Sequence, residues 1–355
     1  MVNMNVNFRH RKMRRPLPGP KSQVRRVALQ LLASCQESGG QLREALQHQD
    51  FAELAPADRA LAYEISGGSL RTRNTLAWML KPFLQRDPPT RLGQILHLSA
   101  YQLVFLDRIP VHAVIHEGTA LAREEGGEKG ASFVHAVLQN LNKRLGKDRD
   151  WLRPGWVSPR ALELKGWEFP RDLTVRLAFA YSHPEWLVDR WLKQWGRPQA
   201  ESWLSAGNQR LHHGVRVNPL RSAKEAVKAQ FRERPGSLLD LGEPHFFLWK
   251  GRGYPGEFPA FRDGSCSFQD LVQYRVGLLM SPGTGERVLD YCAGLGSKTT
   301  HLAELLGNSG RVDAWDIASD RLNLLEASRV RLGLSNITRL PAAPTPAQEQ
   351  ATEDL

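Results

Sequence analysis

A glycine-bearing loop near the end of the chain, in the stretch LDYCAGLGSKTTH at residues 289–301, has the residue types of a cofactor-binding site. The apolar run RVLDY before the loop predicts a strand, and KTTHLAELL after it predicts a helix. A strand, a tight glycine turn and a helix start are how α/β proteins hold the charged part of a nucleotide-like cofactor. Gly294 and Gly296 let the backbone approach a ligand closely. Asp290 can orient the loop or accept a hydrogen bond from a ligand's amine.

A second acid, Asp316, ends the predicted strand RVDAW and lies twenty residues after Gly296. An acid at this place typically accepts hydrogen bonds from ribose hydroxyls. A Walker phosphate loop requires glycines where this chain has Cys292 and Ser297, and the dinucleotide fingerprint GxGxxG requires one at Thr299. The pattern therefore favours S-adenosylmethionine, which carries no phosphate, over a nucleotide that is hydrolysed. A simple tight turn is the structural alternative.

Several elements must precede this loop. Residues 22–146 place apolar side chains at three- and four-residue spacing, which predicts an all-helical domain. Residues 147–170 are interrupted by Pro, Gly and Trp and are expected to be a linker. Residues 171–265 begin with helices and continue with short strands, which predicts an α+β middle domain. Residues 266–340 carry the two β-α units of the loop, and the Pro-, Ala- and Gln-rich residues 341–355 are expected to be disordered.

Other residues with chemical potential have simpler interpretations. His212 and His213 lack a third metal ligand nearby, so a structural or surface role is expected. Four tryptophans with near-helical spacing are expected to fill a core, although one of them could stack on a base: Trp186, Trp191, Trp195 and Trp203. The three cysteines are widely spaced and form no disulfide or metal-ligand pattern. We expect no metal site, and we assign Cys35 to an amphipathic helix, Cys266 to an isolated turn and Cys292 to the cofactor loop.

The charge balance points to nucleic acid. The chain has 48 Lys and Arg against 37 Asp and Glu, and a formal net charge of +11. The stretch FRHRKMRRPLPGPKSQVRR carries eight of these cations and no acid, so residues 1–21 are expected to be a disordered basic arm that binds a phosphate backbone. A solvated tail is the alternative. The predicted RNA-binding residues are Arg11, Lys12, Arg14, Arg15, Arg25 and Arg26. No apolar run is long enough for a membrane span, no secretory signal is evident, and the cysteines suggest a reducing, cytoplasmic setting. We expect a monomer without a membrane partner.

The stretch VLDYCAGLGSKTTHLAELL resembles the first motif of RNA cytosine-C5 methyltransferases, Asp-x-Cys-Ala-Ala-Pro-Gly-Gly-Lys-Thr. The order of other segments is similar to the Sun/RsmB branch, which methylates small-subunit ribosomal RNA. DRALAYEISGGSLR and FVHAVLQNLNKR resemble its NusB-like helical domain, while SHPEWLVDRWLKQWG, VRVNPLRS and FQDLVQYRV resemble later segments. The resemblance covers roughly residues 22–340. It implies a multidomain fold: an all-α NusB-like domain, a small α+β middle domain and part of an α/β Rossmann-like methyltransferase domain.

The resemblance also implies which residues hold the cofactor. It places S-adenosylmethionine against Cys292, Ala293, Gly294, Leu295, Gly296, Ser297 and Lys298, with its ribose on Asp316. Two residues depart from the motif. Leu295 stands where the family has proline, and Ser297 stands where it has the second glycine, so that a Cβ at position 297 is expected to narrow the loop.

The family's reaction adds a cysteine thiolate to C6 of cytosine, which makes C5 nucleophilic enough to accept the methyl group. The Asp-Ala-Pro-Cys and Thr-Cys-Ser segments that provide this chemistry are not in the sequence, and no catalytic residue can be assigned. We therefore expect a C-terminally truncated methyltransferase that is inactive alone. The alternative is a non-catalytic NusB-like RNA-binding protein.

Overall fold

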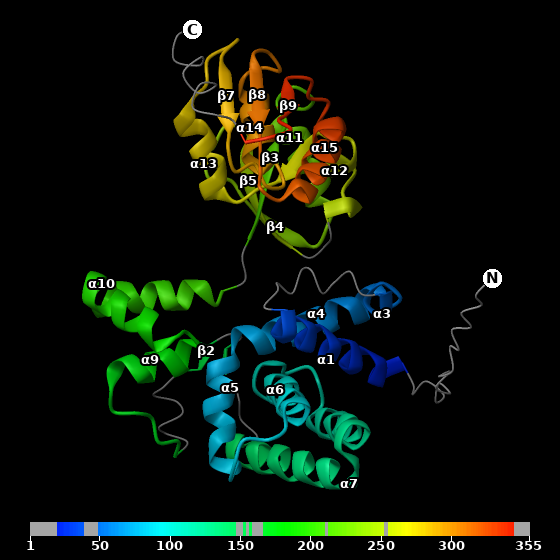
Figure 1. Ribbon diagram of the computed structural model, residues 1–355, viewed down its shortest axis with the longest axis vertical. Coiled ribbons are helices and arrows are strands. Elements are labelled where there is room, and N and C mark those ends of the chain that lie inside the picture. Colours follow the sequence, from blue (N-terminus) through cyan, green and yellow to red (C-terminus); the bar gives the residue numbers. More distant parts are fainter. Residues whose placement is uncertain are drawn as a thin grey trace, which may run out of the picture. The chain divides into compact units, whose positions relative to one another are not determined.

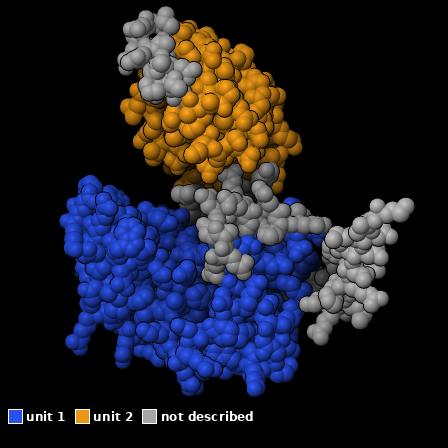
Figure 2. All heavy atoms as spheres, viewed as in Figure 1, with its two compact units in different colours: residues 1–209 blue, residues 210–355 orange. Residues whose placement is uncertain are grey.

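The structure is a computed structural model that describes residues 20–38, 49–146, 152–153, 156–157, 166–209, 212–251 and 255–343. The chain divides into two compact units, residues 1–209 and residues 210–355, which Figure 2 draws in different colours. The first unit is almost entirely helical. The second unit contains two sheets, and it carries the predicted cofactor loop.

The helical unit is built around α6 (Thr90–Phe105), in which nearly every side chain is buried. Leu, Ile, Val and aromatic residues recur along this helix without a polar face, so it can be stable only when other helices surround it. The helices that pack against it are α1 (Pro20–Ser38), α4 (Pro56–Arg71), α5 (Arg73–Leu80) and α7 (Val111–Leu145) (Figure 1). The short α3 (Gln49–Ala52) precedes α4 in the chain, and the 3-10 helix η1 (Lys81–Phe83) follows α5. Pro56 lies in the first turn of α4 and Pro110 directly precedes α7, positions where the fixed φ of proline favours the start of a helix.

Two further helices follow the central bundle in the same unit. A two-residue strand pair, β1 (Leu152–Arg153) with β2 (Trp156–Val157), precedes α9 (Leu173–Tyr181) and α10 (Glu185–Gly207), which is kinked at Gly196 (Figure 1). Trp78 of α5 packs against Phe169 and Phe179 with ring centroids 4.4 and 6.0 Å apart. This aromatic contact explains why α9 groups with the helical unit, whereas the sequence assigned it to the middle domain.

The tryptophans of α10 correct one expectation. Trp186 is 66% exposed and Trp195 is 49% exposed, so these two side chains do not fill a core. Trp191 and Trp203 are partly buried, and their rings meet edge to face at 5.6 Å. Helical spacing alone therefore did not distinguish the packed face of α10 from its exposed face.

The second unit begins with a four-stranded antiparallel sheet in the order β4-β5-β3-β6. Its strands are β3 (His213–Val217), β4 (Gly236–Leu239), β5 (Phe246–Gly251) and β6 (Cys266–Phe268), and its helices are α11 (Lys224–Arg232), η2 (Pro255–Glu257) and α12 (Pro259–Arg262). The core beneath the sheet is aromatic: Phe231 stacks on Phe258 at 4.3 Å, and Trp249 is fully buried. Cys266, expected in an isolated turn, lies instead in β6, which pairs with β3. The expected domain boundary at residue 265 thus falls inside this sheet.

Helix α13 (Leu271–Met280) leads into a three-stranded parallel sheet in the order β7-β8-β9. The strands are β7 (Arg287–Asp290), β8 (Arg311–Ala314) and β9 (Ile337–Arg339), with α14 (Ser297–Leu305) and α15 (Ser319–Leu332) as the crossover helices (Figure 1). Val288, Val312 and Ala314 of the strands pack with Leu302 and Leu325 of the helices in one buried cluster. Parallel strands connected by helices are the arrangement predicted for the two β-α units. Within the described ranges, no helix combines the length and the apolarity needed to cross a membrane.

Candidate cofactor site

The loop between β7 and α14 is fixed by backbone hydrogen bonds to the segment after β8. The Ala293 N–H donates to the Trp315 carbonyl at 3.0 Å, and the Trp315 N–H donates to the Asp290 carbonyl at 3.0 Å. Pairing between β7 and β8 thus continues past the end of both strands. As a result, two segments that the sequence separates by about twenty residues lie side by side at the carboxyl edge of the sheet, where α/β proteins bind ligands.

Asp316 is joined directly to the glycine loop. Its carboxylate accepts the Gly294 N–H at 2.8 Å on one oxygen and the Ala318 N–H at 2.8 Å on the other. These two backbone donors, Ala318 first, lower the pKa of Asp316, so the group is ionised at neutral pH. Each carboxylate oxygen has a second lone pair. The carboxylate can therefore hold the loop and still accept hydrogen bonds from a pair of ligand hydroxyls.

The two glycines of the loop are there for different reasons. Gly294 has φ 53° and Gly296 has φ 83°, a backbone conformation that side chains with a Cβ disfavour. A Cβ on Gly294 would meet no atom closer than 3.8 Å, whereas a Cβ on Gly296 would lie 2.2 Å from Cδ1 of Leu325. Position 294 therefore needs glycine for its backbone angle, and position 296 needs it also for close packing on α15.

The start of α14 places the remaining loop residues. Asp290 accepts a hydrogen bond from the Thr299 hydroxyl at 2.7 Å, which holds the end of β7 against the first turn of the helix. Ser297 is the first residue of α14, and its hydroxyl donates to Gln273 of α13 at 2.9 Å. The side chain at position 297 is thus used in a contact with α13. Lys298 is exposed, and no hydrogen bond or ion pair of its side chain is found among the described residues.

The loop is bordered by two largely apolar side chains to which the sequence alone assigned no role. Ile317, directly after Asp316, is 89% exposed, and the half-exposed Tyr291 lies against Trp315 with ring centroids 4.8 Å apart. An exposed isoleucine beside the loop offers an apolar surface on which a flat ligand group can pack. Its position immediately after the acid was the available sequence signal.

The cysteines differ in accessibility. Cys292 is exposed in the loop, while Cys35 and Cys266 are buried. Burial raises the pKa of the Cys266 thiol to about 12, so this group is a thiol and not a thiolate at neutral pH. No cluster of three or more His, Cys, Asp or Glu side chains able to hold a metal ion occurs in the part of the chain that the structure describes.

The predicted RNA-binding residues can be followed only in part. Arg11, Lys12, Arg14 and Arg15 lie outside the described residues. Arg25 is 8% exposed and its Nε donates to Gln102 of α6 at 2.9 Å, so it packs inside the helical unit and is not offered to a phosphate. Arg26 is partly exposed and forms an ion pair with Glu124, in which its Nη2 donates to both carboxylate oxygens at 2.7 and 2.8 Å.

Comparison with known proteins adds three family matches. The NusB family model matches residues 22–143, a ferredoxin-like domain model of the RsmF/B-like methyltransferases matches residues 183–235, and the 16S rRNA methyltransferase RsmB/F model matches residues 277–352. The middle match includes α10 and β3, which the structure assigns to different compact units.

Two curated relatives and one solved structure extend the likeness over most of the chain. The probable ribosomal RNA small subunit methyltransferase B of Bacillus subtilis (strain 168) is 31% identical over 322 residues, which are 89% of this chain and 68% of the relative. The protein of the same description from Synechocystis sp. (strain ATCC 27184 / PCC 6803 / Kazusa) is 28% identical over 289 residues, 80% of this chain and 61% of the relative. The crystal structure of PH0851 superposes with a TM-score of 0.66 at 19% identity, covering 92% of this chain and 70% of that one, which shows a shared fold.

Together with the three family matches, the parallel sheet with its glycine loop, the preceding antiparallel sheet and the helical domain identify a multidomain methyltransferase. The chain belongs to the ribosomal RNA small subunit methyltransferase B family. The family methylates small-subunit ribosomal RNA, which implies a methyl donor of the S-adenosylmethionine type. The chain spans about two thirds of the length of the two curated relatives, 68% and 61%.

Proposed function

We propose that residues 292–298 and Asp316 bind S-adenosylmethionine, and that the reaction they serve is methylation of cytosine C5 in small-subunit ribosomal RNA. The single observation that carries the proposal is the 2.8 Å hydrogen bond from Gly294 to Asp316. It joins the glycine loop to the acid that would hold the ribose, so loop shape and ribose binding depend on one carboxylate. When bound, the cofactor supplies an electrophilic methyl group.

Several residues in and beside the loop have distinct proposed roles. Asp316 accepts hydrogen bonds from the ribose hydroxyls, and Ile317 covers one face of the adenine. Gly294 leaves room for the cofactor beside the backbone, whereas the absence of a side chain on Gly296 allows the loop to pack on Leu325. Asp290 has one carboxylate oxygen on Thr299, and its other oxygen can accept from the cofactor's amino group. Leu295, which is 39% exposed, adds apolar surface at the mouth of the loop.

The proposed substrate is RNA because of the family and because of the charge. We propose that the NusB-like helical domain and the basic residues 1–21 bind RNA phosphates. The methyl acceptor would then be this RNA and not a small molecule. We also propose that the protein acts as a monomer. Arginine suits this role because its guanidinium can hold phosphate oxygens with two parallel hydrogen bonds.

We further propose that the 355-residue chain alone does not transfer the methyl group. A thiolate must reach C6 of cytosine, yet two of the three cysteines are buried and the third belongs to the cofactor loop. A tritiated-methyl transfer assay on unmodified small-subunit RNA tests this, with the complete Bacillus subtilis relative as the positive control. Turnover by the 355-residue chain above the RNA-only background would contradict it and favour an unrecognised nucleophile.

The second candidate function is RNA binding without chemistry. The same burial of Cys35 and Cys266 favours it. In that case the chain would bind RNA with the same affinity whether or not S-adenosylmethionine is present, and calorimetry would detect no cofactor binding.

Titration calorimetry with S-adenosylmethionine on the whole chain tests the cofactor site. We expect binding that Asp316→Ala weakens roughly ten- to hundred-fold, because the ribose and the Gly294 N–H both lose their acceptor. Asp316→Asn should weaken binding as well, since its amide places a donor against a backbone donor. Asp320→Ala, which removes an exposed acid one turn further on, is the matched control and should change affinity by about twofold or less. Equal affinity in the wild type and both Asp316 variants would exclude Asp316 from the site.

A further inference from the structure

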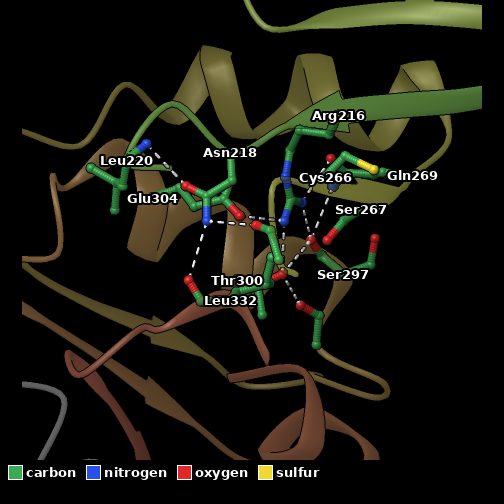
Figure 3. A network of polar contacts seen from close by, with 12 residues as sticks. Arg216, Asn218, Leu220, Cys266, Ser267, Gln269, Ser297, Thr300, Glu304 and Leu332 are labelled. Atoms are coloured by element: carbon green, nitrogen blue, oxygen red, sulfur yellow. Dashed lines mark hydrogen bonds and ion pairs between the residues drawn. The ribbon is translucent and has the colours of Figure 1, made fainter. Parts of the chain in front are cut away.

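A buried arginine lies behind the cofactor loop, on a strand of the neighbouring antiparallel sheet. Arg216 is the fourth residue of β3, and its side chain is 1% exposed. Its Nη1 donates to the Ser297 carbonyl at 2.9 Å and to Gln269 at 3.0 Å, and its Nη2 donates to Thr300 at 3.0 Å and to Glu304 at 2.9 Å (Figure 3). Ser297, Thr300 and Glu304 all belong to α14. One guanidinium thus holds three successive points along the helix that the loop enters.

The same network reaches the loop's last glycine. The Thr300 hydroxyl donates to the Gly296 carbonyl at 2.7 Å, and Gln269 donates through Nε2 to the Ser297 carbonyl at 3.0 Å. The Ser297 carbonyl therefore accepts two side-chain donors from outside the helix, Arg216 and Gln269. The Gly296 and Ser297 carbonyls are the hinge between the loop and α14, and both are held by this network. On the other side of the loop, the Gly294 N–H is held by Asp316.

Apolar packing would be enough to hold two parts of a domain together, so a buried ionic network needs a further explanation. Removing an arginine and a glutamate from water costs free energy, and the attraction between the charges offsets this cost only in part. Burying apolar side chains of the same volume would instead be favourable. Arg216 Nε and Glu304 Oε2 remain buried without a hydrogen-bond partner among the described residues. Burial raises the pKa of Glu304, and the Arg216 guanidinium acts against that rise. Buried ionic groups of this kind have their clearest use where one geometry must be selected over others.

A comparison within the same unit supports this distinction. Arg331 of α15 also ties the methyltransferase part to the antiparallel sheet: its Nη1 donates to the Phe261 and Cys266 carbonyls at 2.6 and 2.9 Å, and its guanidinium lies 3.9 Å from the Phe261 ring centroid. Arg331 contacts neither the loop nor α14 in these bonds. Both arginines thus join the same two parts, but of the two only Arg216 bonds to the segment that shapes the cofactor loop.

We propose that Arg216 is a positioning residue for methyl transfer: by holding the Ser297 carbonyl, Thr300 and Glu304, it fixes the hinge between the glycine loop and α14 and so determines how well the loop receives S-adenosylmethionine. This deepens the proposed function and rests on it. The antiparallel sheet that contains β3 is then part of the cofactor site's support. The physical reason is that Gly296 permits several backbone conformations, so the loop needs partners outside itself to keep one.

The test compares matched variants of the whole chain by two independent measurements. Amide hydrogen exchange without cofactor reports the hinge at residues 296–300, and calorimetry reports the affinity for S-adenosylmethionine. Arg216→Met should raise exchange at the hinge and weaken the affinity, each by about tenfold or more, because four acceptors, three of them on α14, lose this donor. Arg331→Met should raise exchange near residues 261–268 and leave the affinity within about twofold. Arg216→Lys retains the charge without the two-pronged guanidinium and should restore only part of the affinity.

A double variant separates positioning from general stability. Arg216→Met with Glu304→Leu removes both buried charges, so it should recover thermal stability relative to Arg216→Met while the affinity stays low. Recovery of the affinity in the double variant, or an unchanged hinge in Arg216→Met, would overturn the positioning role. If the wild-type chain binds no S-adenosylmethionine while hinge exchange still rises in Arg216→Met, the proposed cofactor function fails but the structural role of Arg216 at the hinge is supported.

Discussion

At the scale of single residues, glycine positions decide what the cofactor loop tolerates. Gly296 and Gly307 both have positive φ, 83° and 65°, and both lie in the second unit. They differ in their surroundings: a Cβ on Gly296 would meet Leu325 at 2.2 Å, whereas a Cβ on Gly307 would meet no atom within 4 Å. The pair therefore separates backbone strain from a steric clash.

We predict that Gly296→Ala lowers the free energy of unfolding of the second unit by about 2–4 kcal/mol, because strain and overpacking add. Gly307→Ala should cost only the strain, about 1–2 kcal/mol. Urea unfolding followed by tryptophan fluorescence measures both. Equal losses of unfolding free energy in the two variants would show that the Leu325 side chain can move aside at little cost in free energy. Gly296→Ala should also weaken S-adenosylmethionine binding, which Gly307→Ala should not.

His97 in α6 makes the helical unit sensitive to acid. Burial, and secondarily the positive charge of Arg73, lower the pKa of His97 to about 4, from an ordinary value near 6.5. The unfolded chain takes up this proton as the pH falls through about 6.5, while the folded chain does so only near pH 4. The stabilising effect of the neutral imidazole is thus complete above pH 6.5 and is lost progressively as the pH falls towards 4.

We predict that the free energy of unfolding of the helical unit falls by roughly 2–3 kcal/mol between pH 7 and pH 4 because of this one residue. His97→Gln should flatten the pH dependence in that window. His116→Gln, which changes a largely exposed histidine, is the control and should leave the slope as it is in the wild type. Circular dichroism during urea titration at several pH values gives the slopes. An unaltered slope in His97→Gln would mean that other groups cause the acid sensitivity.

At the scale of elements, helices α4 and α6 pack so closely at Gly68 that no space remains for a Cβ atom there. A Cβ on Gly68 would lie 1.9 Å from Cζ of Tyr101, whose ring is fully buried and whose hydroxyl donates to Glu64 of α4 at 2.8 Å. A tyrosine that is packed and hydrogen-bonded cannot move without disturbing its neighbours. The absence of a side chain at position 68 is therefore what lets the two helices approach.

We predict that Gly68→Ala destabilises the helical unit by about 1–3 kcal/mol, although alanine is the better helix former. Gly93→Ala in α6 is the opposite case, because its Cβ would meet only Pro88 at an ordinary 3.5 Å. That variant should be neutral or more stable by up to about 1 kcal/mol. Thermal unfolding of the two variants should move the midpoint in opposite directions. A stabilised Gly68→Ala variant would show that the Tyr101 ring can adopt another conformation at little cost in free energy.

At the scale of the whole molecule, charge is the property that the described structure only partly accounts for. Many cations of the folded part are paired, such as Arg26 with Glu124 and Lys228 with Asp240. Arg25 is buried. The eight-cation stretch at residues 8–26 lies mostly before the first described residue, so its predicted role in RNA binding stays a prediction.

We predict that the whole chain binds small-subunit RNA with an affinity that falls steeply with salt, because each neutralised phosphate releases a counterion. Deleting residues 1–19 should weaken binding and flatten the logarithmic salt dependence, whereas Arg26→Gln should change the slope by about one unit at most. Filter binding at several potassium chloride concentrations measures the slopes. A deletion variant with the wild-type slope would assign the phosphate contacts to the helical domain instead.

The sequence alone was sufficient for the fold class, for the loop and for the acid after the second strand. These features are local: apolar spacing predicts a helix, a glycine turn between a strand and a helix predicts a ligand loop, and the order of segments identifies the family. The sequence predicted that Cys266 lies in a turn and that all four α10 tryptophans fill a core. The structure instead places Cys266 in a strand and leaves the side chains of Trp186 and Trp195 exposed. A three-residue strand and the exposed side of a kinked helix have little local signal.

What only the tertiary structure decided is which distant residues support the loop. Arg216 and Glu304 are 88 positions apart, and Gly294 and Asp316 are 22 apart, yet each pair is within hydrogen-bonding distance. As letters, Arg216 is an ordinary cation in a short strand and Glu304 an ordinary acid in a helix. Their pairing depends on how the antiparallel sheet packs against α14, and packing of this kind is set by the sum of many contacts along both elements. For that reason periodicity and motifs predicted the glycine loop, but only the folded chain showed what holds it in place.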